Sequence, residues 1–121
     1  MAWQFNHKTP VFSQIADRLM LEILNGTYSP GEQIPTVRQL AFEAAVNPNT
    51  VQRALAHLEE TGLLYSKGTV GRFVTEELDV LERARARMLR ETVRRWLEEA
   101  STLGLTAEEL IQYIKEEEEN K

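Results

Sequence analysis

Five polar side chains gather in one short stretch and could hydrogen-bond to the edges of nucleic-acid bases. They are Asn47, Asn49, Thr50, Gln52 and Arg53. At the start of a helix, amide, hydroxyl and guanidinium groups can reach base edges in the major groove of DNA, or its phosphates. The free amides and the positive dipole of that helix end also favour phosphate. Each of these residues alone is more often an ordinary surface residue, so the interpretation depends on the elements that position them.

Residue types for catalysis or metal binding are scarce. The chain has no cysteine, and its only histidines, His7 and His57, lie fifty residues apart. A thiolate ligand is therefore excluded, and a zinc site or a catalytic triad is hard to assemble. No nucleophile is paired with a base and an orienting partner. We predict no catalytic site, no metal and no cofactor, and a small hydrolase is the weakest alternative.

The composition predicts one compact domain with a helical appendage. The 121 residues are 42% hydrophobic and 27% charged, which is ordinary for a globular chain with a core. No apolar run is long enough to span a membrane, and residues 1–7 lack the basic and apolar regions of an export signal. We expect a soluble cytoplasmic protein without a membrane partner.

The net charge of −5 argues against DNA binding, but its distribution weakens that argument. Residues 1–76 carry six basic and seven acidic side chains, and residues 77–121 carry eight basic and twelve acidic ones. Four of these acids form the run Glu116–Glu119. The first part is nearly neutral and can bind DNA if its few cations share one face.

Apolar spacing and capping residues predict three short helices in the first part of the chain. Their ranges are 11–24, 36–45 and 47–62. Thr36 and Gln39 form a capping box at the start of the second helix. Asn47 can cap the third helix, and Pro48 suits its first position because that position needs no amide hydrogen.

The order of elements is that of a winged helix-turn-helix. Ala41 is small where the second and third helices approach, and 44–47 is a tight turn. Strands at 63–66 and 72–75 with the loop 67–71 predict a β-hairpin, the wing. Wing cations and glycines can lie over the DNA backbone or minor groove. The candidate wing contacts are Lys67, Gly68, Thr69, Gly71 and Arg72.

Beyond residue 76 the pattern predicts two further helices. The first covers 78–103 and ends before Gly104, and the second starts at Thr106, which forms a capping box with Glu109. Their apolar stripe has little of its own domain to cover, so we predict that 77–121 is a dimerisation tail. The alternative is that the stripe folds back on its own winged domain. The candidate dimerisation residues are Leu81, Met88, Leu89, Val93, Trp96, Leu97, Leu110, Ile111 and Ile114.

Six arginines between residues 83 and 95 permit two interpretations. With only Glu82 and Glu91 beside them, they could extend a DNA-facing surface. They could also be a solvated face, balanced by Glu116–Glu119 of a second copy, and we favour this second interpretation.

Specific motifs resemble the GntR family of bacterial regulators over about residues 9–75. The matching runs are Pro30–Ala41, Val46–Leu55 with Leu58, Gly62 and Leu63, the opening Pro10–Ile15, and Gly71–Val74. The resemblance implies a winged-helix DNA reader. It also implies that Arg38 contacts DNA, that Asn47, Pro48, Asn49 and Thr50 begin the recognition helix, and that 68–71 is the wing tip. Thr36 is a further candidate DNA contact.

Two departures from the family pattern concern the candidate site. Pro48 stands where many members have arginine, so base reading must depend more on Asn49, Gln52 and Arg53. The wing also has one more residue between its glycines than the common pattern. The tail after the wing is too short for a usual effector-binding domain, and in this it resembles the YtrA subfamily.

The predicted fold is mainly α with a small β-hairpin, a winged helix-turn-helix domain (1–76) followed by the tail. The predicted function is a homodimeric repressor that binds an inverted-repeat operator in double-stranded DNA, in analogy with the subfamily near a transporter operon. An unknown small-molecule effector could bind at the dimer interface or between domain and tail. The alternative function is a winged-helix module that binds proteins and not DNA.

Overall fold

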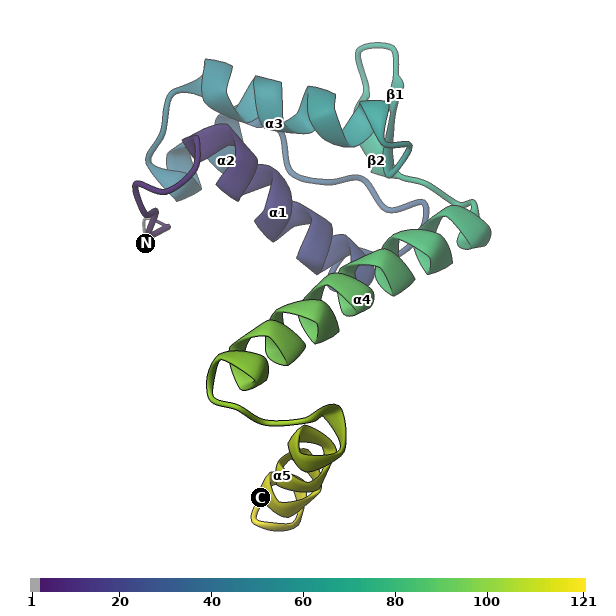
Figure 1. Ribbon diagram of the computed structural model, residues 1–121. Helices are drawn as coiled ribbons and strands as arrows, with labels where there is room; N and C mark the ends of the chain where they lie inside the picture. The colour runs from purple at the N-terminus through teal and green to yellow at the C-terminus, as the bar shows by residue number, and fades with distance from the viewer. Residues whose placement is uncertain (1–2) are drawn as a thin grey trace. The chain divides into compact units, whose positions relative to one another are not determined.

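The computed structural model describes residues 3–121, which form five helices and one two-stranded sheet (Figure 1). The elements are α1 (Val11–Leu24), α2 (Val37–Ala44), α3 (Pro48–Glu60), β1 (Leu64–Lys67), β2 (Gly71–Val74), α4 (Leu78–Thr102) and α5 (Ala107–Glu119). The predicted mainly helical fold with a hairpin is confirmed. No helix in this described part of the chain has the length and apolar character needed to cross a membrane.

The predicted helix starts are confirmed by their hydrogen bonds. Thr36 Oγ1 accepts from the Gln39 amide at 3.1 Å, and Gln39 Oε1 accepts from the Thr36 amide at 2.8 Å. Asn47 Oδ1 accepts from the Asn49 amide at 2.8 Å, and Pro48 is the first residue of α3. These contacts satisfy amide donors that a helix leaves unpaired at its first turn.

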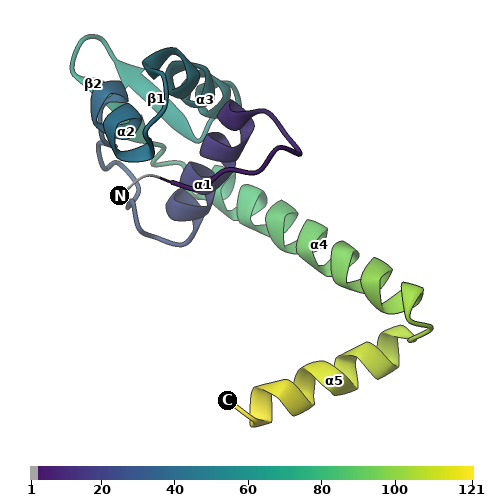
Figure 2. The same cartoon turned by 90° about the vertical axis from the view of Figure 1, so that its left-hand side faces the viewer.

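The chain folds as two compact units, Met1–Ala84 and Arg85–Lys121. In the first unit α1 and α2 pack against α3, and the hairpin lies beside α3 (Figures 1 and 2). The side chains of its core are almost fully buried: Ile15, Leu19, Leu40, Val51, Leu55, Leu58 and Val74. Burying each such side chain contributes about 1.5–3 kcal/mol, so this core fixes the angle between α2 and α3.

The turn between α2 and α3 contains an unusual backbone conformation. Ala45 ends α2 with φ 59° and ψ 49°, in the left-handed region. For a residue with a Cβ atom this conformation costs about 1–2 kcal/mol. Its amide bonds to the Ala41 and Phe42 carbonyls, and the buried Ala44 on one side and Val51 on the other hold the turn in place.

The hairpin is shifted by one residue from its predicted limits. Lys67 pairs with Gly71, so the loop contains only residues 68–70. Residues 31–34 run along β2, which the sequence did not predict. The Gly31 amide donates to the Val74 carbonyl at 2.9 Å, and the Ile34 amide donates to the Arg72 carbonyl at 3.0 Å. The wing is therefore tied to the segment that leads into α2.

The second unit contains the rest of α4 and α5. Gly104, with φ 81°, separates the two helices as predicted, and Thr106 and Glu109 form the predicted capping box. Ala100 is buried, but α5 buries none of its residues. Leu81 was predicted to belong to the dimerisation stripe. It lies instead in the first unit, where it is 6% exposed, so it cannot be part of an exposed stripe.

Candidate nucleic-acid interface

The start of α3 presents its polar side chains to solvent, as the sequence predicts. Asn49 and Gln52 are exposed, and Thr50 is half-buried. The side-chain oxygen of Asn47 caps the helix, so this residue has less freedom to contact a base than Asn49. Pro48 is exposed and has no amide N–H of its own to donate.

Arg38 is the least constrained of the candidate cations in the first unit. It lies exposed in the first turn of α2 and makes no hydrogen bond or ion pair with the residues described. Thr36, beside it, uses its hydroxyl oxygen in the capping box. The five guanidinium donors of Arg38 are therefore available to an external acceptor such as phosphate.

Arg53 has an intramolecular contact that the sequence does not reveal. Its guanidinium carbon lies 3.9 Å from the centroid of the Phe12 ring on α1. This cation–π contact holds Arg53 along the outer side of α3. Arg53 was predicted to contact DNA, but its removal would also uncover the Phe12 ring.

The wing tip is exposed and is braced from one side. Gly68, Thr69 and Val70 face solvent. Gln33 Nε2 donates to the Val70 carbonyl at 2.8 Å, and a Cβ atom on Gly71 would come within 2.6 Å of the same Nε2. Because Gly71 has φ 140°, the backbone favours glycine here, and a larger residue would also displace the Gln33 amide that braces the wing tip. Lys67 remains exposed, with its ammonium 5.0 Å from the Phe73 ring centroid.

Arg72 differs from its prediction as a free wing cation. Its Nε donates to Glu59 Oε1 in a short ion pair, and its Nη1 donates to Gln52 Oε1 at 3.4 Å. The Arg72 side chain is only 18% exposed. Ser66, which is directly opposite Arg72 in the hairpin, donates its hydroxyl to the same Glu59 oxygen at 2.7 Å. Sequence reasoning found neither Glu59 nor Ser66.

Because of the contacts around Glu59, the free energy of unfolding depends on pH in the acid range. Hydrogen bonds from Ser66 and then Arg72 hold the pKa of Glu59 below its ordinary value of 4.5. Its contribution to folding is therefore fully present above the ordinary value, and it is lost as pH falls below that value and through the lowered pKa of Glu59 in the folded protein. We expect urea unfolding between pH 7 and pH 3 to show a larger loss of stability for the wild type than for Glu59→Gln. Parallel curves for the two proteins would contradict this assignment.

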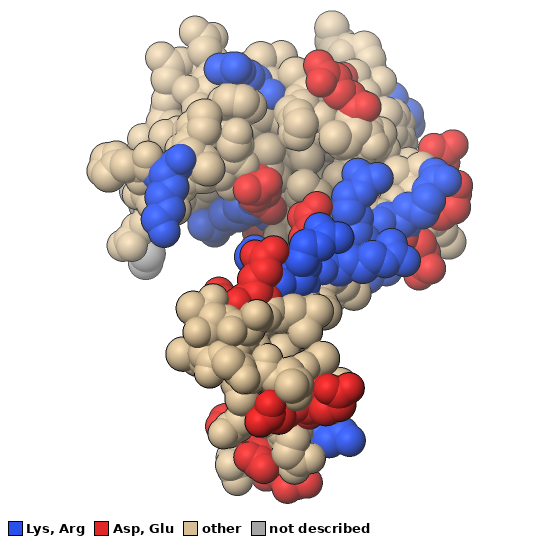
Figure 3. Space-filling model, viewed as in Figure 1, with Lys and Arg blue, Asp and Glu red and all other residues tan. Residues whose placement is uncertain are grey.

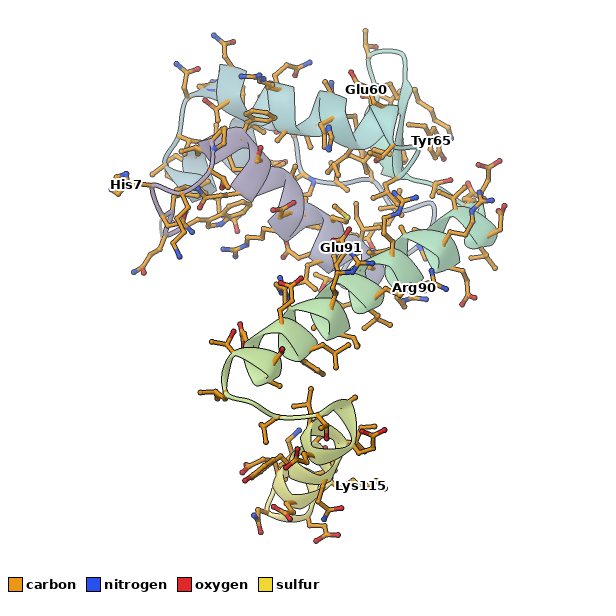
Figure 4. The ribbon with its side chains drawn as sticks, viewed as in Figure 1. His7, Glu60, Tyr65, Arg90, Glu91 and Lys115 are labelled. Carbon is orange, nitrogen blue, oxygen red and sulfur yellow. The ribbon has the colours of Figure 1, made fainter. Side chains whose placement is uncertain are left out.

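The arginines of α4 form a separate basic surface, which gathers along that helix in Figure 3. Arg83, Arg87, Arg90 and Arg94 are spaced by four, three and four residues, so they share one helix face. Arg83 pairs with Asp79 at 3.5 Å. Among residues 3–121 no three His, Cys, Asp or Glu side chains could hold a metal ion, and His7 stands exposed on the loop before α1 (Figure 4).

Sequence comparisons relate this chain to known regulators. The model of the family described as bacterial regulatory proteins, gntR family, matches residues 12–74. The chain is 31% identical to the HTH-type transcriptional regulator YhcF of Bacillus subtilis, over 93% of this chain and 93% of that protein. It is also 31% identical to the HTH-type transcriptional repressor YtrA of Bacillus subtilis, over 89% of this chain and 84% of that protein. These relatives are named as regulators and not as enzymes.

Solved structures agree with the sequence comparisons. A GntR family transcriptional regulator from Listeria monocytogenes matches with a TM-score of 0.87 and 34% identity, over 93% of this chain and 98% of that one. YtrA from Sulfolobus acidocaldarius matches with a TM-score of 0.56 and 27% identity, over 99% and 97%. AraR(DBD) in complex with operator ORX1 matches with a TM-score of 0.57 and 26% identity, over 62% and 95%.

Proposed function

The chain belongs to the GntR family of bacterial regulatory proteins, with YtrA-like relatives along most of its length, and we propose that it represses transcription as a homodimer on an inverted-repeat operator. It is a DNA-binding transcriptional regulator. The finer part of the proposal concerns how it binds. Each protomer inserts the start of α3 in one major groove, and the two half-sites lie about one helical turn apart.

The observation that carries the DNA-binding proposal is the set of uncommitted polar groups that the first unit exposes on α2, on the start of α3 and on the wing tip. Asn49 is exposed at the start of α3, and Arg38 makes no hydrogen bond or ion pair with the described residues. The wing tip, residues 68–70, is exposed and braced by Gln33. Asn49, Arg38 and the wing tip can therefore donate hydrogen bonds to a duplex without breaking an intramolecular ion pair.

The apolar stripe of the second unit supports the homodimer. Leu89, Val93, Trp96 and Leu97 are each between 41% and 58% exposed along α4, and Ile111 and Ile114 of α5 are 51% and 43% exposed. These are large exposures for apolar side chains on neighbouring helical turns, and a second copy would cover them. Half-buried Met88 and Leu110 border the stripe.

Charge supports the same arrangement. Residues 82–95 of α4 carry six arginines and two acids. The residues of α5 carry six acids and one lysine. Opposite charges on the two helices favour contact between the α4 of one copy and the α5 of another. This arrangement leaves the arginines without a necessary role in DNA binding.

A second candidate function is binding of a protein partner, which the 90% exposed Phe42 on α2 favours. An exposed aromatic ring of this kind is typical of interface anchors. A small-molecule effector is also compatible with the proposal. An open hollow of the first unit, lined by residues 32–36 with Tyr28 and Gln39, does not enclose a ligand, so we do not assign the effector to it.

Selection of bound duplexes from a random library at moderate salt tests the proposed function. We expect the wild type to enrich an inverted repeat. A folded dimeric protein that enriches no sequence would contradict operator recognition and favour the protein-binding function. Binding to a single half-site without symmetry would contradict the homodimeric arrangement alone.

A further inference from the structure

Glu59 lies at the point where the wing meets the recognition helix. It is near the end of α3, seven residues after Gln52 and therefore on the same helix face. Its Oε1 atom accepts the Ser66 hydroxyl from β1 and the Arg72 guanidinium from β2. One carboxylate oxygen thus joins both strands of the wing to α3. The side chains of Glu59 and Arg72 are 32% and 18% exposed.

Arg72 also contacts Gln52, so the position of Arg72 affects the orientation of the Gln52 amide. Its Nη1 donates to Gln52 Oε1 at 3.4 Å, from strand β2 to the exposed face of α3. A guanidinium group has five donors and no acceptor. The group of the Gln52 amide that faces Arg72 must therefore be its oxygen and not its NH2. The two N–H groups of Gln52 Nε2 are then left for an external acceptor.

The orientation of this amide has a consequence for base recognition. In the major groove adenine presents the N7 acceptor beside the N6 donor, and a glutamine reads it with both its N–H and its oxygen. Guanine presents two acceptors, N7 and O6. Because Arg72 already occupies one of the two lone pairs of the Gln52 oxygen, this amide suits two acceptors better than it suits the adenine donor.

We propose that Glu59 is a positioning residue for DNA reading, which holds Arg72 against α3 so that Gln52 presents chiefly its N–H donors and prefers guanine to adenine at the base that it contacts. This inference rests on the proposed function, because it requires α3 to enter the major groove. Glu59 itself does not contact the base. The lowered pKa of Glu59 agrees with a carboxylate that stays charged in this position.

The test measures affinities for operator duplexes that carry each of the four base pairs at each half-site position. We expect the wild type to prefer guanine at one position, and Gln52→Ala to abolish that preference. Glu59→Gln should reduce the guanine-to-adenine affinity ratio about fivefold or more at this position and leave other positions unchanged. In the Gln52→Ala background, Glu59→Gln should have no further effect on the ratio.

Two further variants separate positioning from structure and charge. Glu60→Gln removes a charge from the next residue of α3, at the same helix end (Figure 4), and should leave the ratio unchanged. Arg72→Lys retains the positive charge but loses the planar fork that reaches Glu59 and Gln52 together. It should reduce the ratio as Glu59→Gln does, and it replaces that variant if Glu59→Gln fails to fold.

Several outcomes would overturn the inference while the proposed function stands. One is that the wild type selects an operator but shows no guanine preference that Gln52→Ala abolishes. Another is that neither Glu59→Gln nor Arg72→Lys changes the guanine-to-adenine ratio, or that they weaken binding equally at all positions. The last is that Glu60→Gln changes the ratio as much as Glu59→Gln does. If the wild type selects no operator at all, the proposed function itself fails.

Discussion

Arg38→Ala should weaken operator binding roughly 30- to 150-fold, or about 2–3 kcal/mol for the proposed dimer. Each of two protomers would lose one guanidinium contact with phosphate or base, and each such contact contributes about 1–1.5 kcal/mol at the lower end of the usual range. Arg38 is exposed and makes no hydrogen bond or ion pair with the described residues. The variant should therefore keep the melting temperature of the wild type.

The salt dependence of binding distinguishes this explanation from a general loss of charge. Fluorescence anisotropy with the selected operator at several salt concentrations should give a slope smaller by about two in Arg38→Ala, one for each protomer. Lys115→Ala is the matched control, since it removes one exposed cation from α5 (Figure 4). Equal losses in both variants, or unfolding of Arg38→Ala, would contradict the assignment of Arg38 as a DNA contact.

The parts of the fold that depend on neighbouring residues could be predicted from the sequence. The capping boxes at Thr36 and Thr106 and the proline at the start of α3 involve side chains only a few residues apart. Such contacts form wherever the local sequence permits them. The first helix, α1, likewise has the predicted limits because its apolar side chains recur at helical spacing.

Contacts between distant segments could not be predicted in the same way. The bond from Gln33 to the Val70 carbonyl joins residues 37 positions apart. Whether Arg72 faces DNA or Glu59 depends on how closely the wing packs against α3, which no local pattern encodes. The polar residues of the candidate site were found by type, but the sequence could not distinguish Arg38, which is uncommitted, from Arg53 and Arg72, which have intramolecular partners.

The tail presents the same difficulty in another form. Its apolar stripe is visible in the sequence, but a stripe alone does not identify what covers it. The burial of Leu81 in the first unit removes one predicted residue from the stripe. The stripe residues Leu89, Val93, Trp96 and Leu97 are exposed. A substitution among them distinguishes a stripe covered by a second copy from one covered by the chain's own winged domain.

Trp96→Glu should convert the proposed dimer to a monomer, with its dissociation constant raised at least about 100-fold. Trp96 is 46% exposed on α4, and an aromatic side chain at the centre of an interface commonly contributes about 2 kcal/mol or more, here about 3 kcal/mol with the cost of burying a carboxylate. Sedimentation equilibrium would measure the mass. Operator affinity should fall with it, because two half-sites would no longer be bound by one assembly.

Leu21→Glu is the matched control for this prediction, because it places the same charge on an apolar residue of α1 that is 50% exposed. It should leave the mass unchanged. If Trp96 instead packs on its own winged domain, Trp96→Glu should lower the melting temperature without a change of mass. An unchanged mass would therefore exclude the tail dimer, whereas a halved mass with an unchanged melt of the first unit would assign the stripe to a second copy.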